Sequence, residues 1–217
     1  MSREDELRKI VEAHGTWGVW HYTLAAYLPS IFKEGGILPR SELEARGVAY
    51  FDGHYWGSTG KENELADFVC CSFLPSWGMM TTESSDLALI QLDRSVIWSS
   101  GTCFCPGNVA RNAFPASDIK KWTEPEHLEK LYVSAGYVTV AQAELLVGGG
   151  IPLSYFRELV FWDQSSRDDA VGQIEAVLKQ PDFKHPAPNK ISANVNSARF
   201  PKGWAPERVG WQEEGSE

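Results

Sequence analysis

Short apolar segments separated by turn-forming residues constrain the fold of this chain more than any other feature. Each of these segments is typical of a β-strand. Residues 3–14, 25–36, 117–135 and 167–179 show helical patterns, and residues 37–50 run from a strand into a short helix. This mixed order of strands and helices predicts an α+β domain. The strand-like segments span residues 17–23, 67–75, 86–93, 95–101, 137–147 and 151–163.

Two polar insertions interrupt the strand-like segments. The first is His21-Tyr22-Thr23 and the second is Gln142-Ala143-Glu144. Because side chains alternate along a strand, His21 and Thr23 are expected on one face, as are Gln142 and Glu144, with Ala143 turned into the packing. A carboxylate in an apolar segment is costly to desolvate unless it has a partner or a role. For Glu144 the alternative is an exposed edge strand, and for His21 it is a structural role.

The overall composition is that of an ordinary soluble domain. The chain has 217 residues, 43% of them hydrophobic, which is enough for one domain with a substantial core. We therefore expect a single domain over residues 1–217, with a core at about 16–179 and a Pro- and Asn-rich C-terminal extension at 180–217. No apolar run approaches the roughly 18–20 residues of a membrane span, and the N-terminus is charged, so we expect a cytoplasmic protein.

Charge and cysteine content exclude some functions. The formal net charge of −9 argues against a protein that coats duplex DNA, because such affinity comes from neutralising phosphates, although a local basic groove stays compatible. Cys70-Cys71 and Cys103-x-Cys105 do not have zinc-site spacing. We therefore expect free thiols and no metal.

Residues 51–66 form a long segment without regular period, rich in Gly, Ser and Asn. Such segments are lids, binding loops or disordered chain. Aromatic side chains in this segment and in the turn that follows residues 67–75 are candidates for stacking on nucleobases. Core packing is the alternative for any single Trp. The candidates are Tyr55, Trp56 and Trp77.

Four segments of the chain resemble, in order, the core of the DarT family, the DNA ADP-ribosyltransferase toxins of bacterial toxin–antitoxin systems. The segments are "HYTLAAYLPSIFKEGGILP", "ADFVCCSFLPSWGMM", "CFCPGNVARNAF" and "AQAELLVGGGIPLSYFRELVF". The resemblance covers roughly residues 18–162. It implies an ADP-ribosyltransferase-like split mixed β-sheet core with flanking helices. It also implies NAD as co-substrate, single-stranded DNA as acceptor and an antitoxin of the ADP-ribosyl hydrolase type as partner.

The resemblance also implies roles for residues of the two insertions. Glu144 would be the catalytic carboxylate, stabilising the cationic sugar centre as nicotinamide departs. His21 would share in catalysis and hydrogen-bond the NAD ribose or nicotinamide edge, with Thr23 supporting it. Gln142 would read the acceptor. The remaining predicted cofactor-binding residues are Tyr22, Ser72, Met79 and Asn108, and the remaining predicted DNA-contacting residues are Trp56, Lys61 and Arg111, with Lys120 and Lys121 as further phosphate contacts.

The chain departs from the family pattern in the loop before the strand at 67–75. Relatives acting on thymidine have an arginine there, whereas Lys61 is the only cation of this loop. Lys61 supplies charge without the planar bidentate geometry of arginine. Either the contact to an NAD phosphate has moved to another residue, or the chain belongs to a branch of the family with a different acceptor base. The second explanation favours guanine over thymine as the acceptor. Two alternatives remain: an enzyme of the same fold acting on RNA, a protein side chain or a terminal phosphate, and a non-catalytic binding module.

Overall fold

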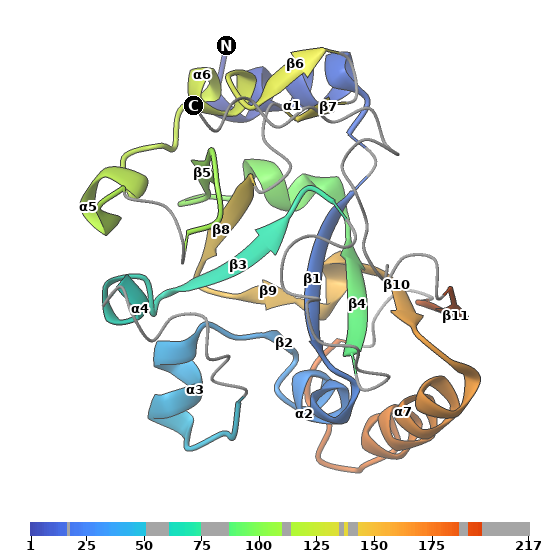
Figure 1. Ribbon diagram of the computed structural model, residues 1–217. Helices are drawn as coiled ribbons and strands as arrows, with labels where there is room; N and C mark the ends of the chain where they lie inside the picture. The colour runs from blue at the N-terminus through green and yellow to red at the C-terminus, as the bar shows by residue number, and fades with distance from the viewer. Residues whose placement is uncertain are drawn as a thin grey trace, which may run out of the picture.

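A seven-stranded mixed sheet forms the centre of the protein, in the strand order β11-β10-β4-β1-β3-β8-β5 (Figure 1). The computed structural model describes residues 1–16, 18–50, 61–74, 87–109, 114–134, 137–138, 143–186 and 191–196. Strands β10 and β11 are parallel, and the other neighbouring pairs of this sheet are antiparallel. The strands are β1 (Val19–Leu24), β3 (Phe68–Ser72), β4 (Leu87–Leu92), β5 (Cys103–Cys105), β8 (Glu144–Gly148), β10 (Phe156–Phe161) and β11 (Ser192–Val195).

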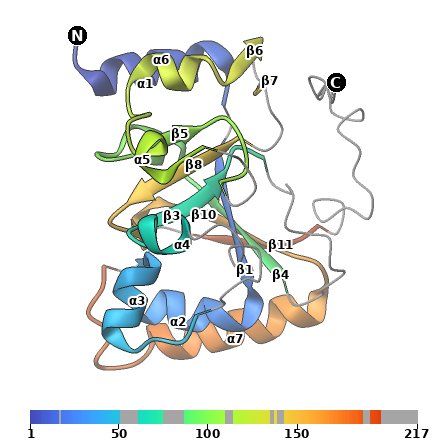
Figure 2. The same ribbon diagram turned by 60° about the vertical axis from the view of Figure 1, so that its left-hand side comes forward.

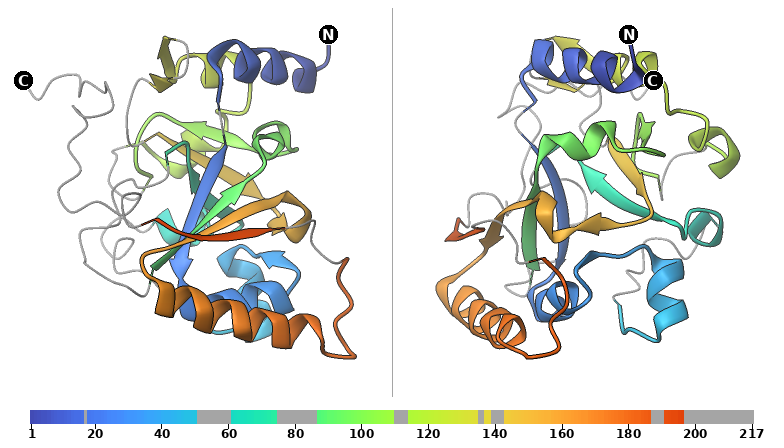
Figure 3. Two further views of the ribbon diagram at one scale, coloured as in Figure 1. Left: turned by 90° about the vertical axis from the view of Figure 1, so that its right-hand side faces the viewer. Right: turned by 180° about the vertical axis from the view of Figure 1, so that it is seen from behind.

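Helices cover the two ends of the sheet, as Figure 2 shows. At one end α1 (Arg3–His14) packs against α6 (Pro125–Glu129) and the 3-10 helix η2 (Arg94–Trp98). At the other end α2 (Leu28–Lys33) lies beside α7 (Gln164–Leu178) (Figure 3). The remaining helices are α3 (Arg40–Arg46), α4 (Lys61–Glu64), α5 (Ala116–Ile119), η1 (Ala25–Tyr27) and η3 (Leu153–Tyr155). Two small two-stranded sheets pair β2 (Gly36–Ile37) with β9 (Ile151–Pro152), and β6 (Tyr132–Ser134) with β7 (Tyr137–Val138).

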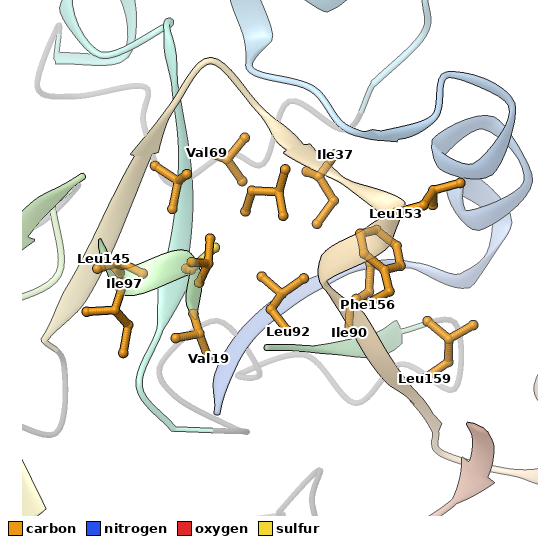
Figure 4. Packing of buried hydrophobic residues seen from close by; sticks show 14 of the residues in the cluster. Val19, Ile37, Val69, Ile90, Leu92, Ile97, Leu145, Leu153, Phe156 and Leu159 are labelled. Atoms are coloured by element: carbon orange, nitrogen blue, oxygen red, sulfur yellow. The ribbon is translucent and has the colours of Figure 1, made fainter. Parts of the chain in front are cut away.

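Both faces of the central sheet are buried. On one face, alternate residues of β1, β4, β8 and β10 meet in the main hydrophobic cluster, which includes Val19, Ile90, Leu145 and Phe156 (Figure 4). On the opposite face a second cluster contains Cys103, Cys105, Val109 and Leu146, and a third contains Trp20, Leu89 and Val160. Because both faces are covered, a polar side chain pointing from the sheet enters a partly desolvated environment.

The sheet is split between β1 and β3. Strand β1 pairs with β4 along its whole length, from Val19 to Leu24. Against β3, the described residues show a single register pair, Trp20 with Ser72. Beyond that pair the two strands diverge, as Figure 1 shows. The predicted split mixed sheet is therefore confirmed, and the split leaves room between β1 and β3 for side chains.

Several elements confirm the predictions made from the sequence. Helix α1 has the predicted bounds. Its N-cap Ser2 accepts from the Asp5 backbone N–H, the Asp5 carboxylate accepts from the Ser2 backbone N–H, and Gly15 ends the helix at φ +66°. The strand predicted at 86–93 is β4. The helix predicted at 167–179 is α7, which begins three residues earlier, at Gln164, because the Asp163 side chain caps it.

The strand predicted at residues 95–101 is wrong, because Arg94–Trp98 form the 3-10 helix η2. The Asp93 carboxylate accepts from the Ser95 backbone N–H at 2.8 Å and starts the turn. Val96 and Ile97 are buried by this tight helix in the main cluster. The apolar side chains of Val96 and Ile97 explain why this segment is buried. The hydrogen bond between Asp93 and Ser95 explains why it is a 3-10 helix and not a strand.

Four other predicted bounds need correction. The described residues of the strand predicted at 137–147 form β7 and β8, which belong to different sheets. The single helix predicted at 117–135 is α5, α6 and β6, because the Trp122 carbonyl accepts from Phe104 of β5 and Pro125 begins a new helix. The helix predicted at 25–36 is η1 followed by α2. The loop predicted at 51–66 contains the short helix α4, and β5 was not predicted as a strand.

Candidate active site

Glu144 is the first residue of β8, in the interior of the sheet. Its register partners are Ser72 on β3 and Cys105 on β5. Strand β8 therefore has a neighbour on each side, and the edge-strand alternative for Glu144 is excluded. Ala143, which precedes it, is 1% exposed and packs in the main cluster, as predicted.

The carboxylate of Glu144 is held by the turn that follows β5. The side-chain Nδ2 of Asn108 donates to Oε1 at 3.0 Å, and the backbone N–H of Val109 donates to Oε2 at 2.8 Å. Each carboxylate oxygen therefore has one donor from the same turn. Two such donors define the plane of the carboxylate as well as its position.

Burial raises the pKa of the Glu144 carboxyl group from 4.5 to about 7, while the hydrogen bond from Val109 opposes that rise. The residue as a whole keeps some exposed surface. At neutral pH the group therefore exists in both the protonated and the ionised form. A pKa close to the operating pH is what general acid–base catalysis requires.

His21 lies on β1, where the sheet splits. Its Nδ1 is 3.0 Å from the carbonyl oxygen of Cys70 on β3. Because a carbonyl oxygen only accepts, the ring proton is on Nδ1, and Nε2 of the neutral ring is an acceptor. Burial lowers the pKa of His21, and the hydrogen bond to Cys70 opposes that change. His21 is therefore suited to accept a hydrogen bond from a hydroxyl or amide group.

Strand β3 lies between His21 and Glu144. The His21 ring binds the carbonyl of Cys70, and Glu144 is level with Ser72, two residues further along β3. Trp20, the residue before His21, is the one level with Ser72. The structure thus places His21 and Glu144 on the two strands that flank β3.

The other predicted residues of β1 and β3 lie close by. Tyr22 packs on the third cluster with Trp20, on the face opposite His21 and Thr23, as alternation predicts. Ser72 is 4% exposed, and its Oγ accepts from the backbone N–H of Leu74 at 3.2 Å. The NAD-binding roles of Tyr22, Thr23, Ser72 and Asn108 stay predictions.

The structure describes only some of the remaining predicted residues. Lys61 begins α4, but its side chain is not described. Lys120 and Lys121 are exposed at the end of α5, where Lys121 pairs with Asp118 at 2.9 Å. The residues outside the described ranges are Tyr55, Trp56, Trp77, Met79, Arg111 and Gln142.

Sequence reasoning missed two groups of this site. The backbone N–H of Val109 and the carbonyl of Cys70 are main-chain atoms, so no residue type signals them. The turn itself was visible as Pro106-Gly107-Asn108, but its contact with residue 144 depends on the pairing of β5 with β8. Among the described residues, no group of three or more His, Cys, Asp or Glu side chains is arranged to hold a metal ion.

A model of the family described as "ssDNA thymidine ADP-ribosyltransferase, DarT" matches residues 20–191. The match covers most of the chain, and the chain belongs to the DarT family of ADP-ribosyltransferases. No similar sequence was found among curated proteins. No helix among the described residues is long and apolar enough to cross a bilayer.

Solved DarT structures share this fold. Thermus sp. 2.9 DarT in complex with ADP-ribosylated ssDNA superposes with a TM-score of 0.59 at 12% identity, over 85% of this chain and 96% of that chain. The same DarT in complex with NAD+ gives a TM-score of 0.55 at 12% identity, over 85% and 97%. Thermosipho africanus DarTG in complex with ADP-ribose gives 0.60 at 15% identity, covering 84% of this chain and 50% of that one. This chain therefore spans about half of the DarTG chain.

Proposed function

We propose that this protein transfers ADP-ribose from NAD to a nucleobase in single-stranded DNA, with Glu144 as the catalytic carboxylate. One observation carries the proposal: a carboxylate in the interior of the sheet, held by two donors, lies one strand away from a neutral histidine at the split. Membership of the DarT family supplies the reaction class. The complexes of Thermus DarT with NAD+ and with ADP-ribosylated ssDNA support the choice of substrates.

In the reaction, the bond between nicotinamide and the ribose anomeric carbon breaks, and nicotinamide leaves with the bonding electrons. Ionised Glu144 stabilises the positive charge that develops on the ribose, an interaction strongest in the transition state. A nitrogen of the base then bonds to the anomeric carbon. Glu144 takes the proton which that nitrogen gives up, as a pKa of about 7 allows.

His21 contributes recognition rather than charge. With its proton on Nδ1 and directed to Cys70, the ring offers Nε2 as an acceptor. A ribose hydroxyl or the carboxamide N–H of nicotinamide is a suitable donor. Because burial favours the neutral ring, His21 adds no positive charge beside the cationic sugar.

Two acceptor bases remain in view. Thymine is the base named by the description of the matched family, and guanine is the base that the loop without arginine favours. Gln142 is proposed to read the base, because an amide both donates and accepts hydrogen bonds. Single-stranded DNA suits either base, since no base pair has to be opened.

The cellular role is proposed from the same family membership. The chain would act as the toxin of a toxin–antitoxin pair in the cytoplasm, where both NAD and DNA are present. The likeness to DarTG supports an antitoxin partner that removes ADP-ribose from the modified base.

The test is incubation of the purified protein with NAD and four single-stranded oligonucleotides, each lacking one base, with products read by mass. We expect one ADP-ribose per modified base, lost only when thymine or only when guanine is left out. Glu144→Gln should lower the rate of transfer by about a thousandfold, since it removes both the charge stabilisation of the sugar and the general base.

Glu158→Gln is the matched control, because Glu158 is also a strand carboxylate bound by an asparagine, on β10 at the far side of the sheet from Glu144. It should transfer at the wild-type rate. NAD consumption without any DNA adduct would instead indicate an RNA or protein acceptor. No NAD consumption would indicate a binding module, and full activity of Glu144→Gln would refute the proposed mechanism.

A further inference from the structure

The turn that holds Glu144 is anchored in the protein interior. The Val109 side chain is 0% exposed and packs with Cys105, Ile119 and Leu146 in the second cluster. The preceding strand β5 is fixed on one side by β8 and on the other by the hydrogen bond from Phe104 to the Trp122 carbonyl. The backbone donor of Val109 therefore has a fixed position relative to β8. The amide of Asn108 supplies the second, side-chain donor.

We propose that Asn108 is a positioning residue, whose amide fixes the orientation and favours the ionised form of the Glu144 carboxylate. The inference rests on the proposed function, in which Glu144 is the reactive group. It differs from the role that the sequence predicts for Asn108, which is contact with NAD. The 3.0 Å hydrogen bond from Nδ2 to Oε1 carries the inference.

The geometry leaves Glu144 able to react. A carboxylate has about four lone-pair sites, and Asn108 and Val109 use one on each oxygen. Among the described residues no other group donates to this carboxylate, so a site on each oxygen remains for the substrate. With Val109 alone, the carboxylate could rotate about its last side-chain bond. The second donor removes that freedom before the substrate binds.

Asn108 also acts on the charge of Glu144, because a donor hydrogen bond favours the ionised carboxylate. The titratable side chains around Glu144 include the thiols of Cys70 and Cys71 on β3 and of Cys105 on β5. Burial raises the pKa of Cys70 and Cys71, so these two thiols stay neutral near pH 7. They therefore contribute little to the pH dependence of Glu144 in that range.

The test compares Asn108→Ala and the nearly isosteric Asn108→Asp with the wild type. The readouts are kcat, KM for NAD and the pH midpoint of kcat, with thermal unfolding to confirm that each variant folds. For Asn108→Ala we expect kcat at pH 7 to fall about tenfold and the midpoint to rise by about one unit, with KM for NAD within about twofold. For Asn108→Asp the midpoint should rise further, because two adjacent carboxyl groups resist ionising together.

Asn194→Ala is the matched control. Asn194 also donates its side-chain amide to a glutamate, binding Glu158 Oε1 at 2.7 Å, but it lies on the edge strand β11. This variant should leave kcat and the pH midpoint as in the wild type. Raised KM for NAD with an unmoved midpoint in the Asn108 variants would overturn the proposal and return Asn108 to NAD contact.

A second measurement separates this inference from the proposed function. Titration of the Glu144 side-chain carboxyl by ¹³C NMR, with the signal assigned from its loss in Glu144→Gln, reports the pKa without turnover. A wild-type protein that consumes no NAD would refute the proposed function. The inference about Asn108 would then still be decided by whether Asn108→Ala moves the titration midpoint of Glu144 upward by about one unit or leaves it in place.

Discussion

At the scale of single residues, burial and hydrogen bonding act in opposite directions on Glu144. Burial raises the pKa of its carboxyl group to about 7, and the hydrogen bond from Val109 limits the rise. The sequence predicted that this carboxylate is either paired or functional, or else exposed on an edge strand. Its donors were not predictable, because one is a main-chain N–H and the other depends on which strand lies beside β8.

The raised pKa of Glu144 predicts how the stabilities of the wild type and of Glu144→Gln differ with pH. The folded state binds the Glu144 proton more tightly than the unfolded state does. The stability that this protonation gives the folded state is fully present below pH 4.5 and is lost as the pH rises through 7. At pH 8 the wild type therefore carries a cost of roughly 3 kcal/mol that the glutamine variant lacks. The free energy of unfolding can be measured in urea at pH 5 and pH 8. Relative to the wild type, the variant should be more stable at pH 8 than at pH 5.

Glu158→Gln is the control for the loss of a strand carboxylate in general. Its free energy of unfolding is measured at the same two pH values. A difference between Glu144→Gln and the wild type that does not grow from pH 5 to pH 8 would contradict the raised pKa of Glu144.

At the scale of elements, close backbone contacts decide where strands pair. Strand β2 pairs with β9 through Gly36 opposite Pro152 and Ile37 opposite Ile151. A methyl group at Gly36 would overlap the Ile151 carbonyl oxygen and lie 2.9 Å from the Pro152 Cα. The helical pattern predicted at residues 25–36 ends in the two glycines Gly35-Gly36, and Gly35, just beyond α2, has the φ of +81° that is typical of a residue following a helix. The need for glycine at position 36 comes instead from a strand that lies more than 100 residues away.

We therefore predict that Gly36→Ala lowers the free energy of unfolding by about 1–3 kcal/mol, because the backbone of β9 has to move. The matched change is Gly172→Ala on the exposed side of α7, where nothing lies within 4 Å of the added methyl group. That variant should gain about 0.5–1 kcal/mol, since alanine favours a helix interior. Thermal unfolding of both variants measures the difference, and equal effects would contradict the packing of β2 on β9.

At the scale of the whole molecule, both faces of the central sheet are covered. The adjacent Cys70 and Cys71 belong to different clusters, on opposite faces, as strand alternation predicts. The extension beyond residue 180 contributes β11, which adds a parallel edge strand beside β10. That pairing was not predicted, because the polar–apolar alternation of residues 192–195 is only four residues long and lies in a Pro- and Asn-rich extension. The division into a core at about 16–179 and an extension stays a prediction.

The covered faces predict how the four thiols react. All four cysteines are free, and only Cys70 is partly exposed, whereas Cys71, Cys103 and Cys105 are at most 3% exposed. Burial raises the pKa of Cys70, which slows its reaction as a thiolate. A colorimetric thiol reagent should therefore modify at most one cysteine quickly in the native protein and four in denaturant. Rapid reaction of two or more native thiols would contradict the packing of the second cluster.

The sequence by itself determined the α+β class, the helix α1, the strand β4 to within one residue at each end, and the interest of His21 and Glu144, which lie on the strands flanking β3. Those features depend on local periodicity and on the cost of burying polar groups, which neighbouring residues express directly. Only the tertiary structure decided that β8 is an interior strand, that the turn after β5 holds Glu144, and that His21 binds the carbonyl of Cys70. These contacts join main-chain and side-chain atoms that are distant in sequence, so they exist only once the strands have paired.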